Sequence, residues 1–474
     1  MQESKIKKIK FHPRIRVPAK ASAWYVISGA VARGIGVFGT PIFTRLLTPE
    51  EYGVFPLFNT WLSLFSALAT LELTGGVVHR GLLRFRGRER EYLFSALGLI
   101  FCLFALFCSL YLLFFERIIN FTGLSAEAAT LLPLQILFSS VSGLFLAKCR
   151  FEYKYKTVAA ISIITALLIP GVSVLLIYTT PMRAMSRIVG TVLVNAALAF
   201  ILLSLLGLSS GQKISFKMWG YMLKFSLPLL PHYLSVAAIL RVGEIAVGRI
   251  YGTAALGKYS VAMSLGLSLT MVTNGLISAL GPWIMRKARA EENEKISDLL
   301  LTVSRGVALL SLFLLSVAPE LLLAITGPVY YEALFAIYPL SLTVIPMFLS
   351  GAFSSWSMYY EKNTRSLFPS LISAVICSVL SLIILPYFHF SFAGIFSLIS
   401  YILLALLSAL TLKSLSGRFP ISVKRIAYLF LFVSFYALLF FLLRENLLSR
   451  TILATSLLPI LFLTARSAWD RIKE

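Results

Sequence analysis

The chain alternates between long apolar stretches and short segments that are charged or rich in Pro and Gly. A helix needs about 20 residues to cross about 30 Å of hydrocarbon. Fourteen stretches of about that length can be marked out, and one of them, 92–115, has no charged residue at all. The pattern therefore predicts an all-α polytopic membrane protein. The expected spans are 22–44, 53–78, 92–115, 128–147, 157–178, 188–208, 219–247, 254–281, 298–324, 333–358, 366–388, 390–412, 426–443 and 451–466.

The composition supports this class. Hydrophobic residues make up 58% of the 474, charged residues only 13%, and the mean hydropathy is +0.87. Soluble globular chains carry about a quarter of their residues as Asp, Glu, Lys and Arg, so a water-soluble protein is excluded. The 36 Phe and 20 Tyr also exclude a disordered chain. The four cysteines have no metal-ligand spacing, so no metal site is predicted.

The basic residues predict the orientation of the helices. If the N-terminus is cytoplasmic, 32 of the 43 Lys and Arg lie in cytoplasmic segments, 8 in outer segments and 3 within spans. This asymmetry favours both termini in the cytoplasm and a location in the plasma (inner) membrane. The first 20 residues contain seven basic residues and no small-residue cleavage site, which favours a cytoplasmic tail over a signal peptide. The net charge of +23 is spread loop by loop over one membrane face, so nucleic acid is not an expected partner.

An internal duplication divides the chain. Residues 45–55 and 249–259 share an Arg, an aliphatic residue, a Gly and an aromatic residue at the same spacing, offset by 204. Six spans separate the two copies, so the halves have the same orientation and should be related by a pseudo-two-fold axis along the membrane normal. We expect an N-terminal lobe of six helices (1–208), a linker (209–218), a C-terminal lobe of six helices (219–413) and a C-terminal helix pair (414–474).

The first copy of the repeat also carries a family resemblance. The segment Phe43-Thr44-Arg45-Leu46-Leu47-Thr48-Pro49-Glu50-Glu51-Tyr52-Gly53 resembles the opening signature of polysaccharide-biosynthesis flippases, which transport O-antigen, capsule or exopolysaccharide repeat units. Residues 254–260 (Ala-Ala-Leu-Gly-Lys-Tyr-Ser) resemble the counterpart of that signature in the second lobe. These flippases belong to the multidrug/oligosaccharidyl-lipid/polysaccharide (MOP) exporter superfamily.

The resemblance implies a function. Such a protein would move undecaprenyl-diphosphate-linked oligosaccharide from the cytoplasmic to the outer leaflet by alternating access, with polymerase or ligase machinery as a candidate partner. A lipid II flippase and a cation-coupled multidrug exporter of the same superfamily remain alternatives. The presence of arginines inside expected spans favours an anionic cargo over the cationic cargo of many drug exporters.

Three arginines lie inside expected spans, at Arg33, Arg241 and Arg305. A charge at the bilayer centre costs about 2.5–3.5 kcal/mol on insertion scales, so each is a candidate to line a cationic substrate cavity. A guanidinium matches phosphate through two parallel hydrogen bonds, and we expect Arg33 and Arg241 to hold the lipid diphosphate. Arg241 could instead form an intrahelical ion pair with Glu244, three residues on, and Arg305 could snorkel to the interface.

Other candidates concern gating and coupling. Arg45 and Arg249 occupy equivalent repeat positions and are expected to anchor the outer interface or act in a gate. Glu72 and Glu244 are carboxylates inside expected spans, and either could couple transport to H⁺ or Na⁺. His232 could be a proton site, although its position beside Pro231 favours a packing histidine that is hydrogen-bonded.

Nothing in the sequence indicates an enzyme. The chain has no phosphate-binding Gly-Lys-Ser/Thr loop and no His-Glu-x-x-His motif, so no cofactor is predicted. A polysaccharide polymerase or ligase would also be polytopic, but such enzymes usually have a large outer loop. The longest outer segment expected here, 116–127, has about a dozen residues.

Overall fold

The computed structural model of the chain describes residues 24, 28–29, 31, 34–36, 39–207, 213–360 and 367–473. Every regular element in these ranges is a helix. The main helices are α2 (Pro49–Thr70), α3 (Gly76–Arg84), α4 (Glu89–Leu113), α5 (Phe115–Thr122), α6 (Ala126–Phe151), α7 (Tyr155–Thr179), α8 (Ser186–Leu205), α9 (Phe216–Ser226), α10 (Leu230–Gly266), α11 (Thr270–Arg289), α12 (Asn293–Thr326), α13 (Leu334–Ser357), α14 (Leu367–Val379), α15 (Phe392–Ser416), α16 (Val423–Leu442) and α17 (Leu447–Lys473). Short turns connect some of them: η1 (Leu227–Leu229), η2 (Pro328–Ala333), η3 (Met358–Tyr360), η5 (Leu380–Ile384) and η6 (Leu385–Tyr387).

Within the described ranges, twelve helical segments are long and apolar enough to cross a membrane. Within the expected first span, 22–44, residues 22–23, 25–27, 30, 32–33 and 37–38 lie outside these ranges. The two expected spans 219–247 and 254–281 form one continuous segment, Phe216–Gly266, followed by α11. The chain between them still turns where the sequence predicted, because Gly252 leaves the helical conformation with φ 84° and ψ 176°. The prediction of a polytopic all-α protein is therefore confirmed.

Several expected spans are interrupted. The stretch 53–78 was expected to be one helix, but α2 ends at Thr70, and Leu71 and Glu72 adopt left-handed conformations before α3 begins. Glu72 thus lies in a break between helices and not within a helix. A second interruption, at Leu227–Leu229, coincides with Pro228, whose missing backbone N–H and fixed φ disfavour an uninterrupted helix.

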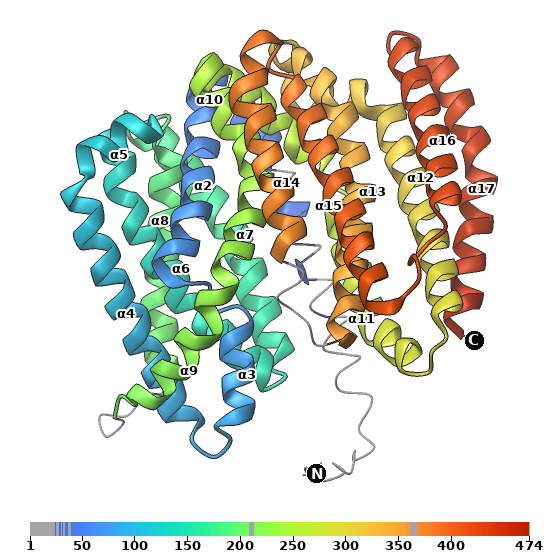
Figure 1. Cartoon of the computed structure of the whole chain (residues 1–474). Helices are drawn as coiled ribbons and strands as arrows, with labels where there is room; N and C mark the ends of the chain where they lie inside the picture. Colours follow the sequence, from blue (N-terminus) through green and yellow to red (C-terminus); the bar gives the residue numbers. More distant parts are fainter. Residues whose placement is uncertain are drawn as a thin grey trace, which may run out of the picture.

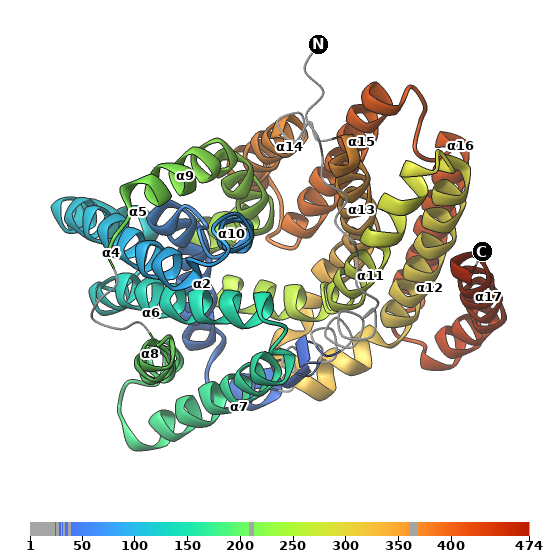
Figure 2. The ribbon, with the colours of Figure 1, turned by 90° about the horizontal axis from the view of Figure 1, so that it is seen from below.

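The helices form two groups with α10 between them (Figure 1). Helices α2–α9 form one group, and α11–α17 form the other, with α16 and α17 at its edge (Figure 2). Helix α9 belongs to the first group because it packs on α3 and α4, where the Trp219 indole N–H donates to the Ser95 carbonyl oxygen at 2.7 Å. The terminal pair is fastened to α12 by Arg450, whose buried guanidinium pairs with Glu320 and donates to the Ser316 carbonyl.

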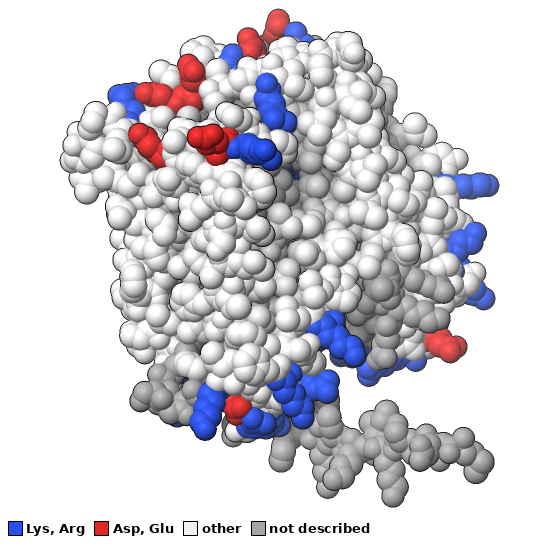
Figure 3. Space-filling model, turned by 60° about the vertical axis from the view of Figure 1, so that its left-hand side comes forward, with Lys and Arg blue, Asp and Glu red and all other residues white. Residues whose placement is uncertain are grey.

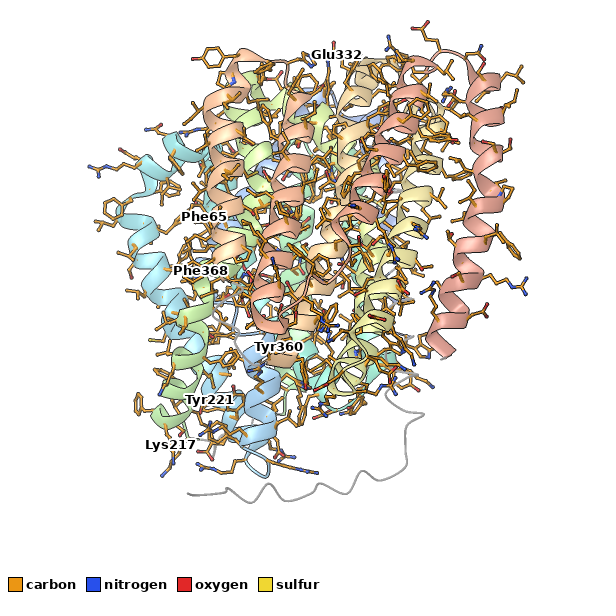
Figure 4. The ribbon with its side chains drawn as sticks, turned by 45° about the vertical axis from the view of Figure 1, so that its right-hand side comes forward. Phe65, Lys217, Tyr221, Glu332, Tyr360 and Phe368 are labelled. Atoms are coloured by element: carbon orange, nitrogen blue, oxygen red, sulfur yellow. The ribbon has the colours of Figure 1, made fainter. Side chains whose placement is uncertain are left out.

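Charged side chains mark the two ends of the molecule. Figure 3 shows a broad uncharged band between an upper rim rich in acidic residues and a lower rim dominated by Lys and Arg. Glu332 lies at the upper end and Lys217 at the lower end (Figure 4). We call these the outer end and the inner end, following the orientation that the basic residues predict. The turn at Gly252 lies near the outer end, because Lys258, six residues further on, pairs with Glu332 at 2.7 Å.

The segment that resembles the flippase signature forms the start of α2. Thr48 is the N-cap: its hydroxyl accepts from the Glu51 N–H at 3.2 Å, and the Glu51 carboxylate accepts from the Thr48 N–H at 2.9 Å. Pro49 occupies the first turn, where its missing N–H costs nothing. This reciprocal cap stabilises the helix start by about 1 kcal/mol and fixes the direction in which α2 leaves the outer end.

Two glycines bring α2 and α10 into direct backbone contact. A Cβ atom on Gly53 would lie 1.9 Å from the Thr253 carbonyl oxygen, and one on Gly257 would lie 2.2 Å from the Pro49 carbonyl oxygen. Both pairs of equivalent positions, Pro49 with Thr253 and Gly53 with Gly257, differ by 204, the offset of the sequence repeat. The two copies of the motif therefore contact each other reciprocally about a pseudo-two-fold axis, and small residues permit this approach of helices in a membrane.

Replacing Gly53 or Gly257 with Ala should destabilise this contact, because the methyl group would overlap backbone atoms that cannot rotate away. We expect a loss of about 1–3 kcal/mol, the usual range for overpacking. Thermal unfolding in detergent can be followed by the reactivity of the buried thiols of Cys149 and Cys377. The control is Gly306→Ala in α12, where a Cβ would meet nothing within 4 Å. Equal unfolding temperatures for all three variants would contradict the contact.

Candidate functional site

The outer end of the interface between the two helix groups is held by a second symmetric set of contacts. The Arg45 guanidinium donates to the Ala324 carbonyl oxygen at 3.0 Å, and the Thr44 hydroxyl donates to the Ile325 carbonyl oxygen at 3.2 Å. In the other direction, the guanidinium of Arg249 lies 4.8 Å from the ring centroid of Phe121. The two arginines that the sequence placed at equivalent positions therefore each reach from one group of helices to the outer tip of a helix in the other.

These helix tips are themselves repeated. α5 ends in Thr122-Gly123 and α12 ends in Thr326-Gly327, again 204 residues apart. Each threonine hydroxyl donates to the carbonyl oxygen four residues earlier, at 2.7 and 2.8 Å, and each glycine has a positive φ. This extension of the repeat is visible in the sequence and could have identified the surfaces that Arg45 and Arg249 contact.

Arg187 is a half-buried cation at the same end that the sequence did not indicate as a candidate. Its guanidinium lies 4.2 Å from the ring centroid of Phe43, 4.1 Å from that of Phe55 and 5.0 Å from that of Tyr52. Its Nη1 has no hydrogen-bond partner among the described residues. Aromatic faces thus stabilise this charge through cation–π contacts where a carboxylate would ordinarily do so. Tyr330 from the second group packs edge-on against Tyr52, with centroids 6.2 Å apart.

Arg241 lies on α10 between the two helix groups, eleven residues before Gly252 and therefore about 16 Å deeper along the helix. Its Nη1 donates to the Glu244 carboxylate at 2.7 Å, and its side chain is 31% exposed. Glu244 is buried, and the same carboxylate oxygen accepts from the Thr60 hydroxyl of α2 at 2.8 Å. The intrahelical pair is therefore present, and it also links the two halves of the molecule within the membrane-spanning region.

The other two candidate arginines are not brought to this place. Arg33 lies outside the described residues. Arg305 lines a pocket between α12, α16 and α17, at the edge of the second helix group. Three arginines were expected to line one cationic cavity. Among the described residues, Arg241 is the one of them that lies between the two helix groups.

The remaining candidates for ion coupling are dispersed. Glu72 lies half-buried in the break between α2 and α3. Nδ1 of His232 lies 2.8 Å from the Ser370 hydroxyl oxygen, so this histidine joins α10 to α14. Of the three, only Glu244 is bonded to a candidate substrate-binding arginine. In the described ranges, no group of three His, Cys, Asp or Glu side chains is arranged to hold a metal ion.

Comparison with solved structures relates this architecture to known transporters. An inward-facing multidrug resistance MATE family transporter of the MOP superfamily is 14% identical, with a TM-score of 0.63, and the match covers 81% of this chain and 94% of that one. A lipid II flippase MurJ in the inward closed conformation is 16% identical, with a TM-score of 0.69, and the match covers 94% of this chain and 99% of that one. An outward-facing MATE family transporter is 16% identical, with a TM-score of 0.59, and the match covers 84% of this chain and 96% of that one. The fold is therefore that of the MOP superfamily.

The sequence comparisons agree with the residues that first suggested a family. A search of curated proteins gave no match. Residues 42–328, well over half of the chain, match the family model described as polysaccharide biosynthesis protein. This range contains both copies of the repeated motif and the contacts of Gly53, Gly257, Arg45 and Arg249 described above. The chain thus belongs to the polysaccharide biosynthesis protein family, as a multi-pass membrane protein with the MOP fold.

Proposed function

We propose that this protein is a flippase that moves a lipid-diphosphate-linked oligosaccharide from the cytoplasmic to the outer leaflet by alternating access. One observation carries the proposal. The two repeated halves meet through a reciprocal backbone contact at the outer end, and a cationic side chain, that of Arg241, lies on the same interface about 16 Å deeper. The family match to a polysaccharide biosynthesis protein supports a glycan-bearing cargo.

The outer contacts would act as the gate of this cycle. Backbone contact at Gly53 and Gly257, with Arg45 and Arg249 reaching across on either side, closes the outer end in the state described. Opening would cost two arginine contacts, the hydrogen bond from Thr44 to Ile325 and the packing of small residues, and among the described residues no ion pair crosses this contact. A few kcal/mol of differential substrate binding would then suffice to shift the equilibrium between the two states.

Arg241 would bind the diphosphate by exchanging partners. In the closed state its guanidinium is occupied by Glu244, which also accepts from Thr60 of the other half. A diphosphate carries about two negative charges and accepts bidentate hydrogen bonds, so it would compete with the single carboxylate. Protonation of Glu244 would also release Arg241, which is how proton coupling would enter the cycle. Arg33 is proposed as a second phosphate ligand from the first span.

A lipid II flippase is the second candidate. The matched lipid II flippase aligns over 94% of this chain, whereas the inward-facing multidrug transporter aligns over 81%. The more extensive likeness therefore favours a lipid-linked cargo over a drug. Either kind of flippase would transport a polyprenyl diphosphate, and the identity of the glycan would distinguish them.

Deletion of the gene should cause a lipid-linked glycan to accumulate on the cytoplasmic leaflet, because synthesis of the repeat unit continues when its export stops. Mass spectrometry of extracted undecaprenyl-linked species would identify that glycan. The control is the same strain carrying the wild-type gene in trans. Accumulation of lipid II would favour the second candidate, and altered drug sensitivity without any glycan accumulation would refute the proposal.

A charge-neutralising pair of substitutions separates binding from packing at Arg241. Arg241→Gln alone would leave Glu244 buried without its ion-pair partner, which costs about 3–5 kcal/mol and could reduce folding by itself. The double variant Arg241→Gln/Glu244→Gln removes both charges and should restore the folded amount. We expect glycan export by the double variant to stay below a tenth of the wild-type rate, since phosphate binding is still lost. Export restored to the wild-type rate would mean that the pair only supports the structure.

A further inference from the structure

A pocket at the edge of the molecule is not used by the proposed transport cycle. It has a volume of about 240 Å³ and lies between α12, α16 and α17. Its walls are mainly hydrocarbon, and they also contain two guanidinium groups. The lining includes Arg305, Leu309, Arg425, Phe432, Ile460 and Thr464. Figure 2 shows these three helices at one edge of the bundle, away from the contact between α2 and α10.

The positive charge of this pocket exceeds the negative charge around it. Asp298 accepts from Arg425 at 3.0 Å and lies 3.1 Å from a nitrogen of Arg471, so one carboxylate serves two arginines. Arg305 follows Asp298 by seven residues, which places it on the same face of α12 and about 10 Å further along the helix. Within the described ranges, Arg305 makes no ion pair or hydrogen bond. Of the two guanidinium groups in the pocket, Arg425 therefore has a carboxylate partner and Arg305 has none among the described residues.

We propose that this pocket binds an anionic phospholipid of the surrounding bilayer. The phosphate would lie between Arg305 and Arg425, and the first methylene groups of an acyl chain would pack on Leu309, Phe432 and Ile460. Guanidinium and phosphate form charge-assisted hydrogen bonds, and basic pockets between helices at the cytoplasmic side of a membrane suit anionic headgroups. Such a site would bind a lipid of the membrane and not the transported cargo.

The size of the pocket fits part of this occupant. At about 30 Å³ for each water molecule, 240 Å³ corresponds to the space of about eight waters. That space accommodates a phosphate and a few carbon atoms, and the rest of the lipid would lie outside it. The inner end, where α12 and α16 begin, also carries most of the Lys and Arg, as Figure 3 shows for one face.

The bound lipid would hold the terminal helix pair at its inner end. At the outer end, Arg450 fastens α17 to α12 through Glu320. Inside the pocket, α16 and α17 face α12 across a gap that the lipid would fill. The C-terminal pair would then be attached to the second helix group at both ends, by the Arg450–Glu320 ion pair at the outer end and, at the inner end, by the phospholipid together with the ion pairs of Asp298.

Native mass spectrometry of the purified full-length protein tests this assignment, with phosphatidylglycerol, phosphatidylcholine and undecaprenyl phosphate as probes. We expect one phosphatidylglycerol to bind at least about tenfold more tightly than phosphatidylcholine. Arg305→Gln should weaken phosphatidylglycerol binding about tenfold, the size expected for one charge-assisted hydrogen bond. Arg305→Lys should retain most of the binding. Ile460→Trp should fill the pocket from a partly exposed position and weaken binding while all charges remain.

The matched control is Lys217→Gln, which removes one positive charge from the inner end at a site on α9, far from the pocket (Figure 4). It should leave phosphatidylglycerol binding unchanged. The proposal is overturned if Arg305→Gln and Ile460→Trp both bind phosphatidylglycerol as the wild type does, or if phosphatidylcholine binds equally well. Tighter binding of undecaprenyl phosphate that depends on Arg305 would also overturn it, by assigning the pocket to the cargo lipid.

Discussion

The backbone contact between α2 and α10 is the constraint from which the rest of the arrangement follows. In a membrane, helices gain little from hydrophobic burial against each other, so close approach through small residues supplies much of the packing energy. Here the approach is reciprocal, because Gly53 lies against the Thr253 carbonyl and Gly257 against the Pro49 carbonyl. Any side chain at either glycine would separate the halves at the outer end. The duplicated motif is therefore conserved between the two halves for a geometric reason, since each copy is the other's binding surface.

This constraint also accounts for how the buried and half-buried arginines are accommodated. Arg187 is surrounded by aromatic rings next to the contact, Arg241 is paired with Glu244 deeper on the same interface, and Arg450 is paired with Glu320 far from it. Arg305 has no such partner in the described part of the chain. An arginine whose charge is balanced by rings or by one carboxylate can exchange that partner for a phosphate at a modest cost. Arg241 is paired with one carboxylate, whereas Arg305 has no partner among the described residues. The two arginines therefore support two separate anion-binding proposals.

The sequence predicted the helical class and the duplication correctly because both depend on patterns that extend over many residues. It also placed Arg45 and Arg249 at equivalent positions, and each contacts the opposite group of helices. The predicted span 53–78 was wrong where the conformation of two residues decides the outcome. The left-handed residues Leu71 and Glu72 end α2 within an apolar stretch, and hydropathy does not register such a break. For Arg305 the sequence left open a cavity position or snorkelling to the interface, because depth along a helix is readable from the sequence, whereas the direction in which a side chain faces depends on neighbouring helices.

The central claim is that the outer contact between the two halves opens and closes during transport. The most direct test is the distance between spin labels on Glu50→Cys and Ala254→Cys, two exposed equivalent positions beside the contact, with Cys102 and Cys108 replaced by alanine. In lipid vesicles, pulsed electron resonance should detect a short distance without substrate and a second, longer distance when the lipid-linked oligosaccharide is added. A single short distance that the substrate does not change, in vesicles that still transport it, would contradict the account.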